Sequence, residues 1–157
     1  MLVLNNSYYT FIETPIGILK ITADKKSITG IIFDPENTEG GKSNEIIELC
    51  KKELQEYFSG ERKSFTVSVN QKGSRFQKKV WNELQKIPYG KTVSYGYIAE
   101  RVGGKNFSRA VGSANNKNHI PIVVPCHRVV GSNGSLTGYA GGLWRKKWLI
   151  MLEEGKR

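Results

Sequence analysis

The stretch SYGYIAERVGGKNFSRAVGSANNKN, residues 94–118, decides the fold of the second half of the chain. Its apolar residues recur at helical spacing on either side of Gly103-Gly104-Lys105, which predicts two short helices joined by a tight turn. Two helices in this arrangement suggest a helix-turn-helix, whose second helix enters a groove of DNA. Short helix pairs are also common in protein cores, so the motif needs a second observation before it indicates DNA binding.

The distribution of charge is that second observation. The 157 residues have a formal net charge of +10. Residues 1–70 carry eight Lys and Arg against ten Asp and Glu, whereas residues 71–157 carry sixteen against four, so a net +12 lies in the second part. A localised positive field favours a polyanionic partner, because each neutralised phosphate releases counterions. A lysine-rich solvated surface is the alternative interpretation.

The first part of the chain has the pattern of a small α/β domain. Residues 8–33 alternate apolar and polar positions around two turns, which predicts an antiparallel meander of strands. An apolar stripe in residues 44–60 predicts a helix that Gly60 ends, and residues 63–70 predict a further short strand.

The charge balance changes sign after this segment, and the pattern turns helical. Residues 74–87 predict a helix with Ser74 as its N-cap, and the helix pair of residues 94–118 follows. We therefore expect two domains: an α/β domain over residues 1–70, with a small antiparallel sheet plus a helix, and a mostly α domain over residues 71–157 that contains the helix-turn-helix.

The run PIVVPCHRVVG, residues 121–131, places Cys126 and His127 side by side among apolar residues. The other cysteine, Cys50, and the other histidine, His119, complete no metal-ligand spacing. A cysteine nucleophile needs a neighbouring base, which His127 can supply. Neighbours on a strand point to opposite faces, however, so the backbone must turn at Pro125, or a water must bridge the pair. From spacing alone, a buried structural thiol and a nucleophile remain equally plausible.

Three blocks of this region closely resemble the O6-alkylguanine-DNA alkyltransferase family, the methylated-DNA-protein-cysteine methyltransferases. They are FQKKVWNELQKIPYGKTVSYGYIAERVG, SRAVGSANNKNHIPIVV and PCHRVVGSNGSLTGYAGGLWRKKWLIMLE, which together cover nearly all of residues 76–153. TPIGILKITADKKSITGIIF in the first part matches more loosely. The resemblance implies a ribonuclease-H-like N-terminal domain and the transfer of an alkyl group from O6 of guanine to the protein itself.

The resemblance also implies the catalytic residues. Cys126 matches the alkyl acceptor, which is alkylated irreversibly, so each molecule acts once. His127 matches the histidine that relays the thiol proton through a water, and Glu153 matches the glutamate that orients this histidine. Asn118 matches the asparagine that ties the second helix to the active-site turn. Tyr95 matches the tyrosine that assists base flipping and helps guanine leave as a neutral base.

Chemistry at O6 requires the base to leave the duplex stack, because the alkyl group is buried between the strands. Arg109 resembles the finger that replaces the extruded nucleotide, and small residues on the same helix permit close approach to the minor groove. The further DNA-contacting residues that we expect are Ala110, Gly112, Ser113, Ala114 and Arg128. The substrate pocket that we expect is lined by Pro121, Val129, Tyr139, Ala140, Gly141 and Lys146.

The expected partner is double-stranded DNA containing O6-alkylguanine, and O4-alkylthymine is a further expected substrate. We expect no cofactor and no metal, because the zinc-binding cysteines of some relatives have no counterpart. No signal peptide or membrane span is recognisable, so we expect a cytoplasmic protein, associated with the nucleoid through DNA. We expect a monomer, and cooperative binding to DNA stays open.

Three other functions compete with this interpretation. A regulatory helix-turn-helix protein would bind DNA without chemistry, and a lesion sensor would bind the alkylated base without repairing it. A cysteine hydrolase would regenerate its thiol, but the sequence indicates no acyl pocket. The presence of Cys126 favours transfer over these three functions.

Overall fold

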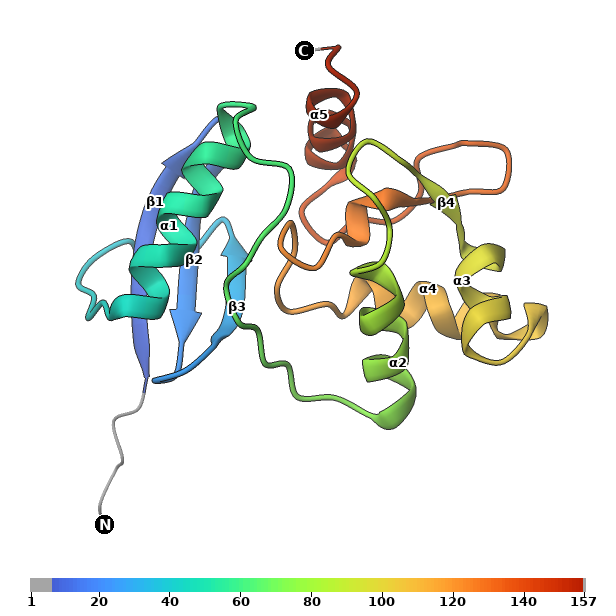
Figure 1. Cartoon of the computed structure of the whole chain (residues 1–157), viewed down its shortest axis with the longest axis horizontal. Helices are drawn as coiled ribbons and strands as arrows, with labels where there is room; N and C mark the ends of the chain where they lie inside the picture. The colour runs from blue at the N-terminus through green and yellow to red at the C-terminus, as the bar shows by residue number, and fades with distance from the viewer. Residues whose placement is uncertain (1–6, 157) are drawn as a thin grey trace. The chain divides into compact units, whose positions relative to one another are not determined.

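Three strands open the part of the chain that the computed structural model describes, residues 7–156. They are β1 (Tyr8–Thr14), β2 (Gly17–Ala23) and β3 (Ile28–Phe33), and they form an antiparallel sheet in chain order (Figure 1). Ile12 pairs with Leu19, and Ile21 with Ile31, so alternate residues bring these four apolar side chains to one face. This meander confirms the alternation expected from the sequence.

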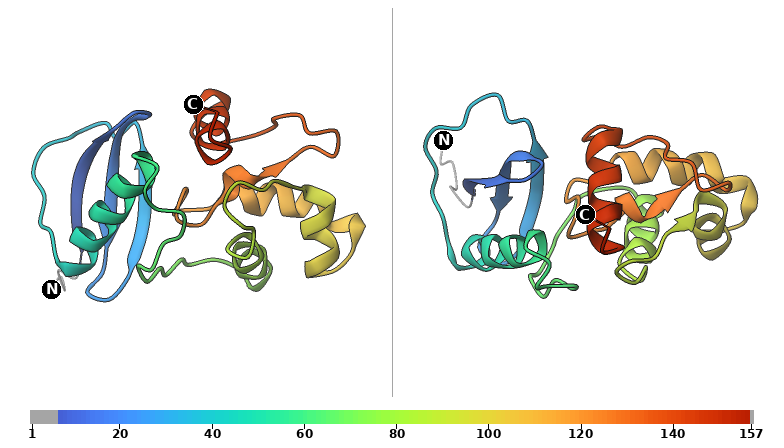
Figure 2. Two further views of the ribbon diagram at one scale, coloured as in Figure 1. Left: turned by 45° about the horizontal axis from the view of Figure 1, so that its top comes forward. Right: turned by 90° about the horizontal axis from the view of Figure 1, so that it is seen from above.

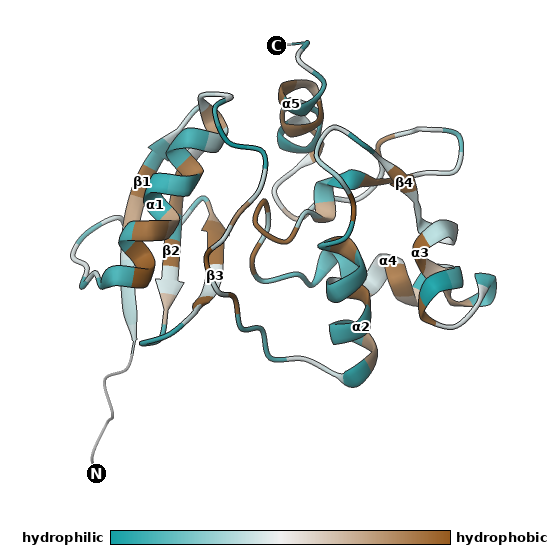
Figure 3. Ribbon diagram, viewed as in Figure 1, coloured by the Kyte–Doolittle hydropathy of each residue, from teal (hydrophilic) through white to brown (hydrophobic). Residues whose placement is uncertain are grey.

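Helix α1 (Glu45–Phe58) covers that apolar face of the sheet (Figure 2). Asn44 caps it, because its side chain accepts a hydrogen bond from the backbone N–H of Ile47. Hydrophobic and hydrophilic bands alternate along the helix in Figure 3, as expected when one stripe faces a sheet and the other faces solvent. Cys50 and Leu54 lie on the buried stripe.

The strand expected at residues 63–70 does not form. A single bridge joins Val69 to Ile28, flanked by hydrogen bonds between Ile28 and its neighbours in that segment. The buried Glu53 carboxylate instead accepts hydrogen bonds from the backbone N–H groups of Thr66 and Val67. These donors are therefore not available to extend the sheet.

The chain divides into two compact units between Gln71 and Lys72. The elements of the second unit are α2 (Arg75–Leu84), β4 (Val93–Ser94), α3 (Tyr95–Val102), the 3-10 turn η1 (Lys105–Phe107), α4 (Ser108–Asn116), the 3-10 turn η2 (Cys126–Arg128), β5 (Val129–Val130) and α5 (Leu143–Glu153). This unit is mostly helical, as expected from the sequence.

The helix-turn-helix consists of α3 and α4, which pack against each other and against α2. Ser94 caps α3, and Ser74 forms a reciprocal capping box with Gln77 at the start of α2. A Cβ atom at Gly103 would lie 2.9 Å from the ring of Phe107, so the turn between the helices requires a residue without a side chain there.

A short parallel pairing brings distant parts of the second unit together. Val93 pairs with Val129, and Ser94 pairs with Val130. As a result, η2 lies beside the residues that lead into α3. The nucleophile candidate Cys126 is thereby held next to the helix-turn-helix.

Candidate active site

Two consecutive tight turns determine the position of Cys126: a γ-turn at Pro125 and a 3-10 turn that begins at Cys126. The backbone N–H of Cys126 donates to the carbonyl of Val124 at 2.8 Å, and Pro125 between them has φ −82° and ψ 67°, the geometry of an inverse γ-turn. Because Cys126 and His127 then begin a 3-10 turn, they escape the alternation of a strand. The backbone therefore turns at Pro125, as the pairing of cysteine with histidine requires.

Ile122, a little earlier in the loop, has φ +74° although it is β-branched and buried. Val123 donates to the carbonyl of Pro121 at 2.9 Å across it, which makes a strained γ-turn. Asn118 holds this loop from both sides, since its Nδ2 donates to the Val124 carbonyl at 2.8 Å and its Oδ1 accepts from the N–H of Ile120 at 3.0 Å.

The Cys126 thiol is buried, with 5% of the residue exposed. The side chains of Asn118 and Tyr139 lie within hydrogen-bonding reach of it, and Lys146 contributes positive charge. Burial nevertheless dominates and raises the pKa of the thiol to about 11, against the opposing effects of these neighbours. The resting thiol is thus protonated at neutral pH and requires a base.

The candidates for the base and for the group that orients it are His127 and Glu153. His127 Nε2 lies 2.6 Å from Glu153 Oε2, and both residues are buried. Burial lowers the pKa of His127 despite the opposing carboxylate, so its ring is neutral at neutral pH. Burial by itself would raise the pKa of Glu153, but hydrogen bonds and charge from His127 and Arg128 hold it well below its usual value.

Arg128 takes a different place from the one we expected. Only 7% of the residue is exposed. Its Nε and Nη2 donate to the two oxygens of Glu153 at 2.8 and 3.0 Å, and its Nη1 donates to the carbonyl of Ile87 at 2.7 Å. Each of the three guanidinium nitrogens thus donates to a group inside the protein, and this buried position corrects the expectation that Arg128 contacts DNA.

Lys146, an expected pocket residue, and Tyr95 both bind the main chain at Thr137. Lys146 Nζ donates to the carbonyl of Thr137 at 2.6 Å, and the Tyr95 hydroxyl donates to the same carbonyl at 3.2 Å. Burial lowers the pKa of Lys146 to about 8. Sequence reasoning missed Thr137, because its contribution is a main-chain carbonyl that no residue type signals.

All but one of the α4 residues expected to contact DNA are at least partly exposed to solvent. Arg109, Ala110 and Ser113 are exposed, and Gly112 is half-buried. Ala114 is buried instead, and its carbonyl accepts a hydrogen bond from Trp81 Nε1 at 2.9 Å, so it packs against α2 rather than facing outward. That places Ala114 outside the expected contact surface.

Asn115, the next residue of α4, is a site residue that sequence reasoning missed. It is buried, and its Nδ2 lies 3.3 Å from the carbonyl of Cys126, to which it donates. Together with Asn118, which follows α4, it connects the end of this helix to the carbonyls of Cys126 and Val124 on either side of Pro125. The helical spacing between Val111 and Asn115 could have indicated that Asn115 lies on a buried face. It could not have indicated that Asn115 binds the carbonyl of Cys126.

The remaining expected pocket residues differ in exposure. Pro121, Val129 and Gly141 are buried, whereas Ala140 is exposed. Within residues 7–156, no group of three or more His, Cys, Asp or Glu side chains could hold a metal ion. No described helix is long and apolar enough to cross a membrane.

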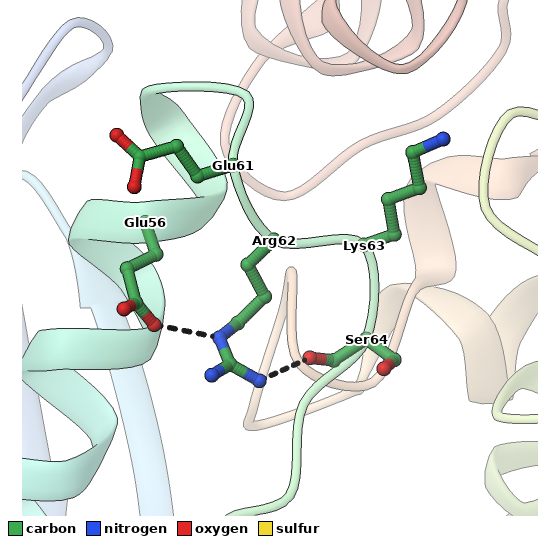
Figure 4. Close-up of a pocket in the computed structure, with 5 residues that line it drawn as sticks. All are labelled: Glu56, Glu61, Arg62, Lys63 and Ser64. Atoms are coloured by element: carbon green, nitrogen blue, oxygen red, sulfur yellow. Dashed lines mark hydrogen bonds and ion pairs between the residues drawn. The ribbon is translucent and has the colours of Figure 1, made fainter.

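A surface pocket lies in the first unit (Figure 4). It is lined by Glu56, Glu61, Arg62, Lys63 and Ser64. Arg62 donates to the Glu56 carboxylate and to the Ser64 carbonyl, both at 2.9 Å, so its charge is already neutralised by the protein. The lining contains neither cysteine nor histidine, whereas the candidate nucleophile Cys126 and its neighbour His127 belong to the second unit.

A helix-turn-helix joined to a buried cysteine, histidine and glutamate defines a DNA-directed transferase with a cysteine acceptor. The family model for the ribonuclease-like domain of 6-O-methylguanine DNA methyltransferase matches residues 7–71, and the model for its DNA binding domain matches residues 75–155. The chain therefore belongs to the 6-O-methylguanine DNA methyltransferase family.

Known proteins with similar sequences match this chain over nearly its whole length. A methylated-DNA--protein-cysteine methyltransferase of Methanosarcina acetivorans is 44% identical, over 93% of this chain and 97% of its own. The constitutive one of Bacillus subtilis is 48% identical, over 94% and 95%. A crystal structure of the Mycobacterium tuberculosis O6-methylguanine methyltransferase superposes with a TM-score of 0.85 at 39% identity, covering 96% of this chain and 94% of that one.

A second Mycobacterium tuberculosis crystal structure was solved in complex with DNA. It has a TM-score of 0.85 at 40% identity, and the match covers 94% of this chain and 93% of that one. These comparisons confirm the expected fold class, a small α/β domain followed by a helical DNA-binding domain. They also confirm the expected enzyme class: the chain is a DNA-repair enzyme of the methylated-DNA-protein-cysteine methyltransferase type.

Proposed function

We propose that the chain binds double-stranded DNA containing O6-alkylguanine and transfers the alkyl group irreversibly to Cys126. The observation that carries this proposal is the buried Cys126 thiol beside a neutral His127 that Glu153 orients at 2.6 Å. In the reaction the cysteine sulfur forms a bond to the alkyl carbon, and the bond from that carbon to O6 breaks. The electron pair stays on the base, which takes up a proton and becomes guanine.

The thiol proton leaves toward His127, directly or through a water. Because the pKa of Cys126 is about 11, base assistance must accompany the attack at neutral pH. The product thioether carries no leaving group that the site can release, so each protein molecule reacts once. In this proposal the Tyr95 hydroxyl assists departure of the neutral base.

DNA binding is assigned to the exposed face of α4. Arg109 and Ala110 lie at its beginning and Ser113 one turn later, and small residues allow the helix to approach the minor groove. In this proposal Arg109 fills the gap in the base stack after the alkylated nucleotide has been flipped. O4-alkylthymine is a second substrate of the same flipping and transfer steps. The protein acts as a monomer, on the nucleoid DNA of the cytoplasm.

The test is mass spectrometry after incubation with a duplex that carries one O6-methylguanine. We expect a stoichiometric gain of one methyl group on the peptide containing Cys126. Cys126→Ala should gain none, and Cys50→Ala should behave like the wild-type protein, because Cys50 is buried in the first unit. An unchanged mass despite tight binding to the lesion would assign the chain to the non-catalytic sensors instead.

A further inference from the structure

Arg128 is buried beside the candidate catalytic residues. A side chain buried there cannot reach the phosphates of DNA. Four nitrogen atoms surround the Glu153 carboxylate. Oε1 accepts from Arg128 Nε at 2.8 Å and from the backbone N–H of Gly90 at 3.1 Å. Oε2 lies 3.0 Å from Arg128 Nη2 and 2.6 Å from His127 Nε2.

This arrangement determines which nitrogen of His127 carries the proton. A carboxylate offers about four acceptor positions, and a guanidinium and a backbone N–H can only donate. Three such obligatory donors keep Glu153 ionised and acceptor-only. His127 Nε2 must therefore donate as well, and since a neutral imidazole carries one N–H, its Nδ1 keeps a lone pair.

The lone pair of Nδ1 is not used elsewhere in the described part of the chain. Nδ1 is buried and makes no hydrogen bond to any group among residues 7–156. It is thus the nitrogen through which His127 can accept the proton of its neighbour Cys126. If His127 adopted the other tautomer, Nε2 would place a lone pair against the ionised Glu153.

Arg128 is itself fixed before any substrate binds. Its Nη1 donates to the Ile87 carbonyl at 2.7 Å, and its guanidinium lies 5.8 Å from the centre of the Tyr89 ring. Gly90, in the same segment, has φ +80°, and a Cβ atom there would lie 3.2 Å from the Glu153 carbonyl. The segment that leaves α2 is thus fitted closely against the end of α5.

We propose that Arg128 is a positioning residue for alkyl transfer: with the N–H of Gly90 it saturates Glu153 and so holds His127 in the tautomer whose Nδ1 accepts the thiol proton. This inference rests on the proposed function of Cys126 and His127. Arg128 acts through Glu153 and touches neither the alkyl group nor DNA.

Arg128 also influences the charge of His127. The charged groups that face His127 are Glu153 and Lys146 from α5 and Arg128 from its own turn. Burial contributes most to the lowered pKa of His127, and Arg128 and Lys146 lower it further while Glu153 opposes them. Replacing Arg128 by an uncharged residue therefore raises the pKa of His127.

The experiment measures the single-turnover rate of methyl transfer from a duplex with one O6-methylguanine, between pH 5 and pH 8. Arg128→Met should be roughly tenfold to hundredfold slower at neutral pH, because a misoriented base loses part of its contribution. The acidic limb of its pH profile should move to higher pH, since His127 is protonated more readily. Arg128→Lys keeps the charge but loses the planar fork, so its rate should fall with little movement of the limb.

Binding to an unmodified duplex at several salt concentrations separates this role from DNA contact. We expect the affinity and its salt dependence to equal those of the wild-type protein, because no phosphate contact is removed. Arg62→Met is the matched control for lost stability, as Arg62 pairs with the buried Glu53 of the first unit at 3.2 Å. It should unfold more readily and still transfer the methyl group at the wild-type rate.

Two further measurements keep the inference falsifiable if the variants fold poorly. Nitrogen-15 NMR of His127 in the wild-type protein should show a proton on Nε2, and a proton on Nδ1 would overturn the proposal. In a Glu153→Gln background, Arg128→Lys should add little further loss of rate. Wild-type transfer rates in both Arg128 variants, or a weaker salt dependence of their DNA binding, would also contradict it. Absence of methylation in the wild-type protein would instead refute the function itself.

Discussion

Cys126, the proposed nucleophile, lies in an environment that suppresses ionisation of its thiol. The residue is buried, and its thiol has a pKa of about 11. A freely diffusing reagent should therefore react with the thiol differently from an alkylated nucleobase held against the sulfur. Only the reaction with the nucleobase would use His127 as the acceptor of the thiol proton. At this scale the site protects its thiol until a substrate enters.

Modification by iodoacetamide tests this property. Reaction of Cys126 should be slow at neutral pH and should accelerate as the pH rises toward 11, because the thiolate is the reacting form. Cys50, whose pKa burial raises to about 12, should react more slowly still. Peptide mass spectrometry at a series of pH values measures both rates, and rapid modification of Cys126 at pH 7 would contradict the assignment.

Asn118 is the residue on which the strained loop before Cys126 depends. Asn118→Ala removes one donor and one acceptor that hold Val124 and Ile120, and each buried group left unsatisfied costs about 1–3 kcal/mol. We expect a lower midpoint of urea unfolding and slower methyl transfer. Asn82→Ala, an exposed change on α2, is the control and should alter neither property.

At the scale of elements, α4 has two faces with different tasks. Val111, Ala114 and Asn115 are buried, and the last of these reaches the carbonyl of Cys126. Arg109 and Ser113 are exposed on the opposite side. The same helix therefore connects the surface assigned to DNA with the turn that holds the nucleophile.

Arg109→Ala separates base flipping from chemistry. Without the side chain that we propose to replace the extruded nucleotide, methyl transfer from duplex DNA should become at least about tenfold slower, because flipping costs a few kcal/mol. Transfer from the free base O6-methylguanine needs no flipping and should be unchanged. Comparing the two rates in one variant is the measurement, and an equal loss with both substrates would exclude this role for Arg109.

At the scale of the whole molecule, the two units contain different chromophores. All three tryptophans, Trp81, Trp144 and Trp148, belong to the second unit. Tryptophan fluorescence during urea unfolding thus reports the unit that carries the active site. The buried charges of that unit make its stability depend on pH.

The second unit should lose stability on acidification. The pKa of His127 is below its ordinary 6.5, so the unfolded chain binds the proton first and stability falls as the pH drops below about 6.5. The pKa of Glu153 is far below its ordinary 4.5, so its contribution is complete above pH 4.5 and is lost at lower pH. Tryptophan-monitored urea unfolding at pH 7.5, 5.5 and 4 checks this order, and constant stability over that range would contradict it.

Much of the fold and part of the site could be predicted from the sequence. The alternation of apolar and polar residues predicted the three strands, helical spacing predicted α1 to α4, and Ser74 was predicted as a cap. These features could be predicted because they depend on local preferences of the chain. The expected strand at residues 63–70 failed because the distant Glu53 takes the backbone donors of Thr66 and Val67. No local pattern records such a competition.

The sequence by itself determined the reactive pair, the basic second half and the resemblance that names the family. The tertiary structure decided the roles of Arg128, Ala114 and Asn115, because burial and hydrogen-bond partners depend on segments far apart in the chain. From the sequence, an arginine next to a nucleophile is easily interpreted as a phosphate contact. The fold shows instead that Arg128 binds Glu153 at the end of α5. Residue type fixes what a side chain is able to donate, and the fold decides which group accepts.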